Sequence, residues 1–223
     1  MDLKILRPSS SSIWLKCPAS YFLSKDSEEL FGEEESSVFA DAGTYYHQCM
    51  ENLVKGLPFE RNKFCLTLTK EKEIQTNALS SYETFIVPML QGAEFVTCEE
   101  RINKDFDNGW EISGQIDLKF IKNGVMNVLD YKYGKGIIEA TSPQLSCYAL
   151  LASQGLPVKV WVLQPRVKKP ITSREISVEE NLAFESTLRD YINSDLNVEA
   201  PQCRPELSVC KYCKGGKLCQ YKI

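Results

Sequence analysis

Two acidic residues and a lysine in the middle of the chain have the types and spacing of a site that cleaves phosphate esters. Asp130 ends an apolar run, Asp117 lies one predicted strand earlier, and Lys132 follows Asp130 by two positions. Carboxylates at neighbouring strand ends repel each other until a hard divalent cation such as Mg²⁺ binds between them beside phosphate oxygens. Because side chains alternate along a strand, Lys132 can reach the attacking water and the scissile phosphate. An isolated Asp-x-Lys would indicate only surface charge, but the second acid favours a site.

A second group of chemically active residues lies in the last part of the sequence. Cys210, Cys213 and Cys219 place three thiols within ten residues, in a stretch rich in lysine and glycine. Cys-x-x-Cys spacing lets a turn present two sulfurs to one metal, and nearby lysines favour the thiolate. Tetrahedral Zn²⁺ and a [4Fe–4S] cluster both need four ligands, so the fourth comes from Cys203 nearby or from the remote Cys17.

Other residues of these types have packing interpretations. Cysteines at 49, 65, 98 and 147 fall in predicted helices or strands or stand alone, and free cysteine behaves as a small buried hydrophobe. His47, taken alone within an apolar helical pattern, indicates a hydrogen-bonded structural residue more than a ligand. Glu99 and Glu100 are expected to decorate a strand, although one of them could face the metal.

Periodicity and turn signals place these residues on helices and strands. Serines at 9–12 cap a short helix that stops by Pro18, with Cys17 near its end. Turn signals at 107–109 and 123–124 join three strands into an antiparallel meander, with Asp117 on the middle strand and Asp130 at the end of the next. The predicted helices cover 37–55, 70–90, 141–155 and 177–193, and the predicted strands cover 94–102, 110–121, 125–131 and 158–163.

This order of elements predicts an α/β fold with a mixed central sheet flanked by helices. Length and composition fit one domain over residues 1–223. The net charge of −4 argues against a protein that coats nucleic acid non-specifically, although residues 203–223 carry a local excess of basic side chains. Without a long apolar run or a signal-peptide pattern, we expect a soluble cytoplasmic protein with no membrane partner.

Several motifs, taken in order along the chain, resemble one branch of a known nuclease superfamily. They are Trp14–Pro18, Gly43–His47, Gly114–Asp117, Leu129–Gly134, Gln144–Tyr148 and the closing cysteines. Together they resemble the RecB-type branch of the PD-(D/E)XK nucleases, in particular the iron–sulfur exonucleases of phages and CRISPR adaptation modules. The resemblance implies a restriction-endonuclease-like core, with a helical part at 1–92, an αβ nuclease core at 93–195 and a cluster-binding tail at 196–223.

The resemblance also implies roles for the residues of the central site. Asp117, Asp130 and His47 would bind catalytic Mg²⁺ or Mn²⁺, helped by the backbone carbonyl of Tyr131. Lys132 would be the catalytic lysine. Position 130 is aspartate where many members of the superfamily have glutamate. Both supply oxygen ligands, so this difference leaves the implied activity intact.

Two further groups take their roles from the same resemblance. Gln144 and Tyr148, one turn apart on a predicted helix, correspond to a glutamine–tyrosine motif that lies beside the active site and contacts substrate. Cys17 would be the fourth ligand of a [4Fe–4S] cluster whose other ligands are Cys210, Cys213 and Cys219, with Zn²⁺ as the alternative metal. Such a centre would join the N-terminal and C-terminal segments and serve stability, not redox catalysis.

The function that follows is a metal-dependent DNA exonuclease acting on single-stranded or duplex ends, in recombination, repair or replication of a phage or mobile element. A helicase or recombination protein and a second copy of the chain are the protein partners it implies, in a host cytoplasm if the chain is phage-encoded. The rival interpretation is a non-catalytic DNA-binding module that contains zinc or an iron–sulfur cluster.

Overall fold

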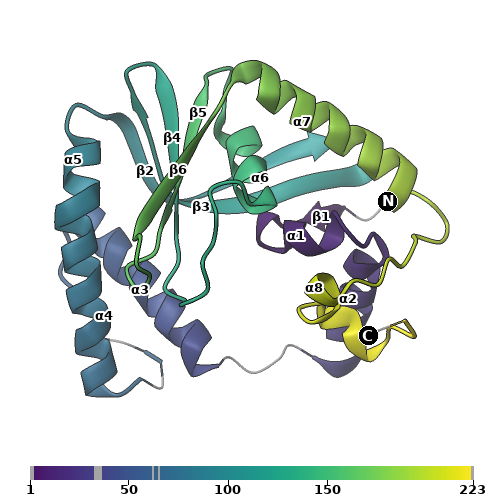
Figure 1. Cartoon of the computed structure of the whole chain (residues 1–223), viewed down its shortest axis with the longest axis horizontal. Helices are drawn as coiled ribbons and strands as arrows, with labels where there is room; N and C mark the ends of the chain where they lie inside the picture. The colour runs from purple at the N-terminus through teal and green to yellow at the C-terminus, as the bar shows by residue number, and fades with distance from the viewer. Residues whose placement is uncertain (1–2, 33–36, 62, 65, 222–223) are drawn as a thin grey trace.

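A six-stranded mixed sheet forms the centre of the molecule (Figure 1). The computed structural model describes residues 3–32, 37–61, 63–64 and 66–221. Its strands are β1 (Lys4–Leu6), β2 (Glu94–Phe106), β3 (Trp110–Lys122), β4 (Val125–Tyr131), β5 (Val158–Leu163) and β6 (Ile171–Ile176). The path is β1-β3-β4-β5-β6, and β2 also pairs with β3. β1 with β3 and β4 with β5 are parallel pairs, whereas the other pairs are antiparallel. The predicted α/β class with a mixed sheet is therefore confirmed.

The long strand β3 organises this sheet. β2 pairs along most of its length, from Trp110 to Ile121. On the other edge of β3, β1 pairs with residues 110–112 and β4 pairs with residues 118–122. Residues 113–117 of β3 lie between the β1 and β4 pairings, and Asp117 is the last of them. On this edge of β3, the gap between the two neighbouring strands therefore ends at the Asp117 carboxylate.

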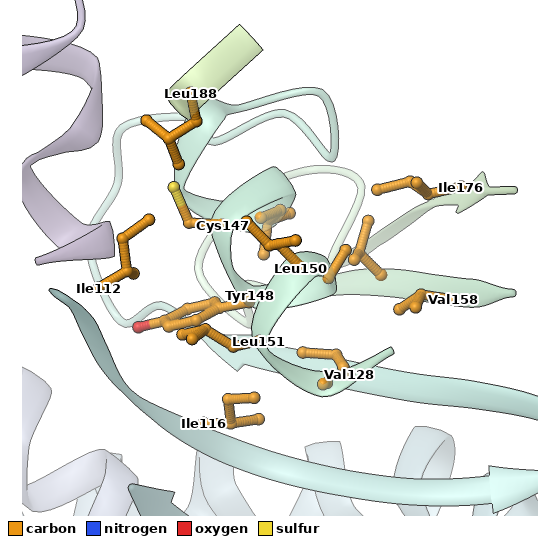
Figure 2. Packing of buried hydrophobic residues seen from close by; sticks show 14 of the residues in the cluster. Ile112, Ile116, Val128, Cys147, Tyr148, Leu150, Leu151, Val158, Ile176 and Leu188 are labelled. Carbon is orange, nitrogen blue, oxygen red and sulfur yellow. The ribbon is translucent and has the colours of Figure 1, made fainter. Parts of the chain in front are cut away.

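Helices cover both faces of the sheet. They are α1 (Ser11–Trp14), α2 (Ala19–Phe31), α3 (Val38–Lys55), α4 (Leu68–Ser81), α5 (Val87–Leu90), α6 (Pro143–Ala152), α7 (Val178–Tyr191) and α8 (Leu207–Cys210). One buried cluster joins α1, α6 and α7 to the sheet, and a second joins α3 and α4 to it. α6 is buried at seven of its ten residues because it is apolar on nearly every side. Figure 2 shows its Cys147, Tyr148, Leu150 and Leu151 packed among residues of the sheet and Leu188 of α7.

Glycine at position 114 of β3 allows α6 to approach the sheet closely. A Cβ atom there would lie 2.9 Å from Cε1 of Tyr148 and 2.9 Å from Cγ of Pro8. Neither contact is tolerated by close-packed atoms. The glycine of the Gly114–Asp117 motif therefore sets the height of the Tyr148 ring above β3.

Most predicted elements are present, with different ends. The meander, the helix at 37–55 and the strand at 158–163 are confirmed. The predicted helix at 70–90 forms as α4 and α5 joined by a π-helical turn over Tyr82–Ile86. Strands β1 and β6 and helices α2 and α8 were not predicted. Predictions for Cys65 fall outside the described residues.

The first and last parts of the chain lie side by side. Figure 1 shows α2 against the C-terminal tail that contains α8. Within the described ranges, no helix combines the length and apolarity needed to cross a membrane.

Candidate metal centre and cysteine cavity

Asp117 and Asp130 lie where β3 and β4 separate. The last matched pair of these strands is Leu118 with Leu129, so each aspartate is the next residue beyond it. The N–H of Tyr131 donates a hydrogen bond to Oδ2 of Asp117 at 2.5 Å. Asp117 is 7% exposed and Asp130 is 1% exposed. The fold therefore brings two carboxylates that are almost inaccessible to solvent to one point of the sheet.

Three side chains from different elements form a group that can hold a metal ion. Ligand atoms of His47 on α3, Glu99 on β2 and Asp117 on β3 all lie within 4.8 Å of one another. Nδ1 of His47 is 3.2 Å from Oδ1 of Asp117 and 3.9 Å from Oε1 of Glu99. One imidazole and two carboxylates offer nitrogen and oxygen ligands to a divalent cation.

Helix α3 positions His47 through well-defined ends. The Ser37 side chain accepts a hydrogen bond from the N–H of Ala40, which caps the start of the helix. The helix ends at Gly56, whose left-handed backbone suits glycine. Between these ends, Tyr46 is fully buried and stacks on Tyr133, with ring centroids 4.9 Å apart. This stacking fixes α3 against the segment that follows Lys132.

Glu99 is held in an unusual backbone conformation. Its φ of 52° lies in the left-handed region, which residues with a Cβ seldom adopt. The flanking pairs, Cys98 with Leu118 and Glu100 with Ile116, place it across from Asp117. Opposed like charges on neighbouring strands destabilise a sheet unless something compensates. Such strained positions gather at functional sites.

A second set of contacts surrounds Asp130. Its Oδ1 accepts hydrogen bonds from Nζ of Lys132 at 2.9 Å and from Nε2 of Gln144 at 3.2 Å. The same Gln144 nitrogen lies 3.2 Å from the Tyr148 hydroxyl. α6 therefore brings Gln144 to the carboxylate and Tyr148 to Gln144, and Lys132 and Asp130 lie side by side.

Electrostatics show that the cluster is short of positive charge. Burial raises the pKa of Asp130 to about 6; the Lys132 ammonium opposes this rise, and the Asp117 charge adds to it. Burial and the Asp117 charge raise the pKa of Glu99 to about 7, although His47 acts against them. Burial lowers the pKa of His47, but its charge interaction and hydrogen bond with Asp117 outweigh burial and raise it to about 9. A divalent cation would replace this proton and lower these carboxyl pKa values.

Two buried oxygens support the fit of a cation. Oδ2 of Asp130 and Oε1 of Glu99 have no hydrogen-bond partner among the described residues. Buried polar atoms without a partner are rare in folded proteins and call for an explanation such as a bound ion. Asp130 is not one of the three residues whose ligand atoms lie within 4.8 Å of one another; its Oδ1 accepts from Lys132 and Gln144.

The residues predicted for the central site therefore lie close together, and Glu99 lies with them. His47, Asp117, Asp130, Lys132, Gln144 and Tyr148 lie around one point, and Tyr131 contributes its N–H to Asp117. From the sequence, either Glu99 or Glu100 could face the metal, and in the structure it is Glu99 that lies beside His47 and Asp117. Glu100 points elsewhere and binds Nζ of Lys119 at 3.0 Å.

Five cysteines line a single small cavity between the N-terminal helices and the tail. They are Cys17, Cys203, Cys210, Cys213 and Cys219. The sulfurs of Cys203 and Cys219 are 3.6 Å apart, and the sulfur of Cys17 accepts a hydrogen bond from the N–H of Arg204 at 3.4 Å. Both candidates for the fourth ligand therefore reach this cavity, and the thiols present fit a thiolate-bound metal or cluster.

The other described cysteines lie elsewhere. Cys49 and Cys147 are buried in the two hydrophobic clusters, as packing residues should be, and Cys98 is half-buried at the edge of one of them. Burial raises the pKa of Cys49 to about 11 and that of Cys147 to about 12, which keeps both as thiols at neutral pH.

Comparison with protein families places the chain. The model of a family described as "Protein of unknown function (DUF2800)" matches residues 4–223, nearly the whole sequence. The chain belongs to the DUF2800 family. The matched residues include both the central site and the cysteine tail.

Two solved structures resemble this DUF2800 member. A protein from Eubacterium rectale described as a "Putative exonuclease" shares 15% identity at a TM-score of 0.55, over 99% of this chain and 91% of its own. The protein SSO0001 shares 17% identity at a TM-score of 0.36, over 91% of this chain and 96% of its own. The first match shows that the DUF2800 chain shares the fold of the Eubacterium rectale protein.

A glycine in the tail gives a test of the cysteine cavity in this DUF2800 protein. A Cβ at Gly215 would lie 2.4 Å from Cβ of Leu23 and 2.6 Å from its carbonyl carbon. We therefore expect Gly215→Ala to separate the tail from α2 and to destabilise the protein by about 1–3 kcal/mol, as overpacking does. Thermal unfolding would measure this loss, with Gly134→Ala as a control because its Cβ would meet nothing within 4 Å. Equal melting temperatures for the two variants would show that the tail is not packed as described.

Proposed function

We propose that this chain is a metal-dependent DNA nuclease of the PD-(D/E)XK type, acting as an exonuclease. The observation that carries the proposal is the meeting of Asp117 and Asp130 with His47, Glu99 and Lys132 at the point where β3 and β4 separate. Buried acids, an imidazole and a lysine suit phosphodiester hydrolysis better than binding alone, because a purely binding surface has no need of buried carboxylates with raised pKa values.

Each residue has a role in this proposal. His47, Glu99, Asp117 and Asp130, with the Tyr131 carbonyl, would hold Mg²⁺ or Mn²⁺, which would activate water and neutralise charge on the phosphate. Lys132 would leave Asp130 for the substrate, where its ammonium orients the nucleophile and stabilises the transition state. Gln144 and Tyr148 would then orient Asp130 and contact the substrate.

The cysteine cavity would serve as a structural centre. Cys17, Cys210, Cys213 and Cys219 would bind a [4Fe–4S] cluster, with Zn²⁺ as the alternative, and would hold α2 against the tail. A chain-closing centre stabilises mainly by restricting the unfolded chain.

The proposed substrate is DNA with single-stranded or duplex ends, processed in recombination, repair or replication, in the cytoplasm. A helicase or recombination protein would supply any motor activity. The fold shared with the Eubacterium rectale protein supports the nuclease class, and the implied exonuclease action comes from the motif resemblance.

The proposal is tested with end-labelled linear DNA, single-stranded and duplex, and anaerobically purified protein. We expect Mg²⁺- or Mn²⁺-dependent degradation that falls by about 100- to 1,000-fold in Lys132→Ala, the loss typical when one transition-state charge donor is removed. Lys25→Ala, an exposed lysine on α2, is the control and should match the wild type. Absence of cleavage by a folded, metal-loaded wild type, or full activity in Lys132→Ala, would contradict the proposal.

A further inference from the structure

Two loops leave the sheet next to the candidate metal centre. Residues 133–140 follow Lys132 at the end of β4, and residues 164–170 join β5 to β6. The two strands are parallel neighbours, and the N–H of Lys132 donates to the carbonyl of Leu163 at 2.9 Å. Both loops therefore start from the same end of the sheet, beside the catalytic candidate Lys132 (Figure 1).

A buried glutamine fastens one loop to the other. Gln164 is 3% exposed, and its side-chain nitrogen donates to the carbonyl of Gly136 at 2.8 Å. Its side-chain oxygen accepts from the N–H of Ile138 at 2.9 Å. Both ends of one buried amide are thus used to fix residues 136–138, which gives the loop a defined conformation without secondary structure of its own.

Arg166 strengthens this connection at the residue after Lys132. Its guanidinium lies over the Tyr133 ring at 4.9 Å from the centroid, and its Nη1 donates to the Tyr133 carbonyl at 3.4 Å. The Tyr133 hydroxyl accepts from Asn77 of α4 at 2.9 Å. The Arg166 guanidinium is therefore held in place by its contacts with Tyr133.

The charge of the two loops is strongly unbalanced. Residues 133–140 and 164–170 contain Lys135, Arg166, Lys168 and Lys169 but only one acid, Glu139. Lys135, Lys168 and Lys169 are exposed, and none has a carboxylate within ion-pair distance in the described part of the chain.

The basic tail differs in this respect. Arg204 pairs with Asp195, and Lys214 pairs with Glu28 at 3.2 Å. Lys211 and Lys217 lie over the rings of Tyr212 and Phe31. These contacts hold the tail against its own surroundings, so the tail has less charge available for a ligand than the two loops.

We propose that the two loops form a cationic surface that binds the phosphodiester backbone of the DNA strand entering the metal centre, with Lys168 and Lys169 as its main contacts. This inference rests on the proposed nuclease function and names the surface that guides its substrate. Exposed lysines that have no ion pair to break can bind phosphates directly, and such contacts carry no base specificity.

The test is fluorescence anisotropy of a labelled single-stranded oligonucleotide, titrated with protein in EDTA so that cleavage does not occur. We expect the double variant Lys168→Ala/Lys169→Ala to bind about tenfold more weakly and to reduce the slope of log affinity against log salt by about 1.4, because each single-strand phosphate contact contributes about 0.7. The control Lys25→Ala/Lys159→Ala removes the same charge from α2 and from the far end of β5, and should bind as the wild type does.

The outcomes separate this inference from the proposed function. Tight binding by the wild type with no loss in the loop variant, or with the loss found instead in Lys211→Ala/Lys217→Ala, would overturn the cationic surface and leave the nuclease proposal standing. Absence of DNA binding by the folded wild type in EDTA would also overturn the cationic surface, whereas the proposed nuclease function is overturned only by absence of cleavage in the metal-loaded assay.

Discussion

Replacing Asp130 with asparagine is expected to reduce metal-dependent DNA cleavage severely and, at the same time, to stabilise the metal-free protein. Asparagine keeps the oxygen that accepts from Lys132 and Gln144, so the local geometry can persist. It removes a carboxylate oxygen that is buried without a hydrogen-bond partner among the described residues. A cation would lose a charged ligand, while the empty fold would lose an unfavourable charge.

The sign of the stability change follows from the pKa of Asp130, which is raised to about 6 in the folded chain. A carboxyl with a raised pKa favours unfolding above its ordinary titration range, so at pH 7–8 asparagine removes a cost on the order of 1–3 kcal/mol. The expected loss of cleavage is about a thousandfold, since a metal site supplies several kcal/mol and each 1.4 kcal/mol is worth about a factor of ten.

Chemical denaturation in EDTA and cleavage assays in Mn²⁺ measure the two effects. Asp105→Asn makes the same chemical change at an exposed position of β2 and should alter neither quantity. A variant that is both inactive and markedly less stable without metal would mean that Asp130 is a structural residue, not a charge held for a cation.

Replacing Cys17 with serine should remove the metal centre of the tail. We expect loss of bound iron or zinc and a fall in melting temperature of roughly 10 °C, because a link that closes nearly the whole chain is worth on the order of 5 kcal/mol. Metal analysis, the visible absorbance of the anaerobic protein and thermal unfolding check this result.

Cys203→Ser is the matched comparison, because its sulfur lies in the same cavity. It should keep the metal and most of the stability. The opposite pattern, with metal lost in Cys203→Ser and kept in Cys17→Ser, would assign the fourth ligand to Cys203 and leave the N-terminal helix outside the centre. Metal retained in both variants would mean that Cys17 and Cys203 can each serve as the fourth ligand, because either variant leaves four cysteines in the cavity.

The sequence predicted the elements that carry strong local signals. The meander was readable because 107–109 and 123–124 are clear turns between β-rich runs, and α3 because its apolar spacing is regular over its length. α2 was missed although Tyr21 and Phe22 pack against the core, because its fully buried residues are Ser20 and Ser27 and its burial therefore does not follow apolar residue type. β1 and β6 are a three-residue strand and an edge strand, which exist through pairing with neighbours more than through their own pattern.

The site shows the same division. Asp117, Asp130 and Lys132 could be singled out because strand order and alternation place them. Glu99 could not be chosen over Glu100, because its part in the group depends on a left-handed residue facing Asp117 across the β2–β3 pair. The choice between Cys17 and Cys203 likewise depends on a three-dimensional contact between distant segments.

The contact between α2 and the tail has a consequence for synthesis of the protein. Leu23 on α2 leaves the ribosome long before Gly215, the residue that packs against it, has been made. Throughout that interval Cys17 and the surface around Leu23 lie open to solvent, oxidants and chaperones. The nascent chain can complete its central sheet well before its two distant segments meet, so the final closure is a late and slow step of biogenesis.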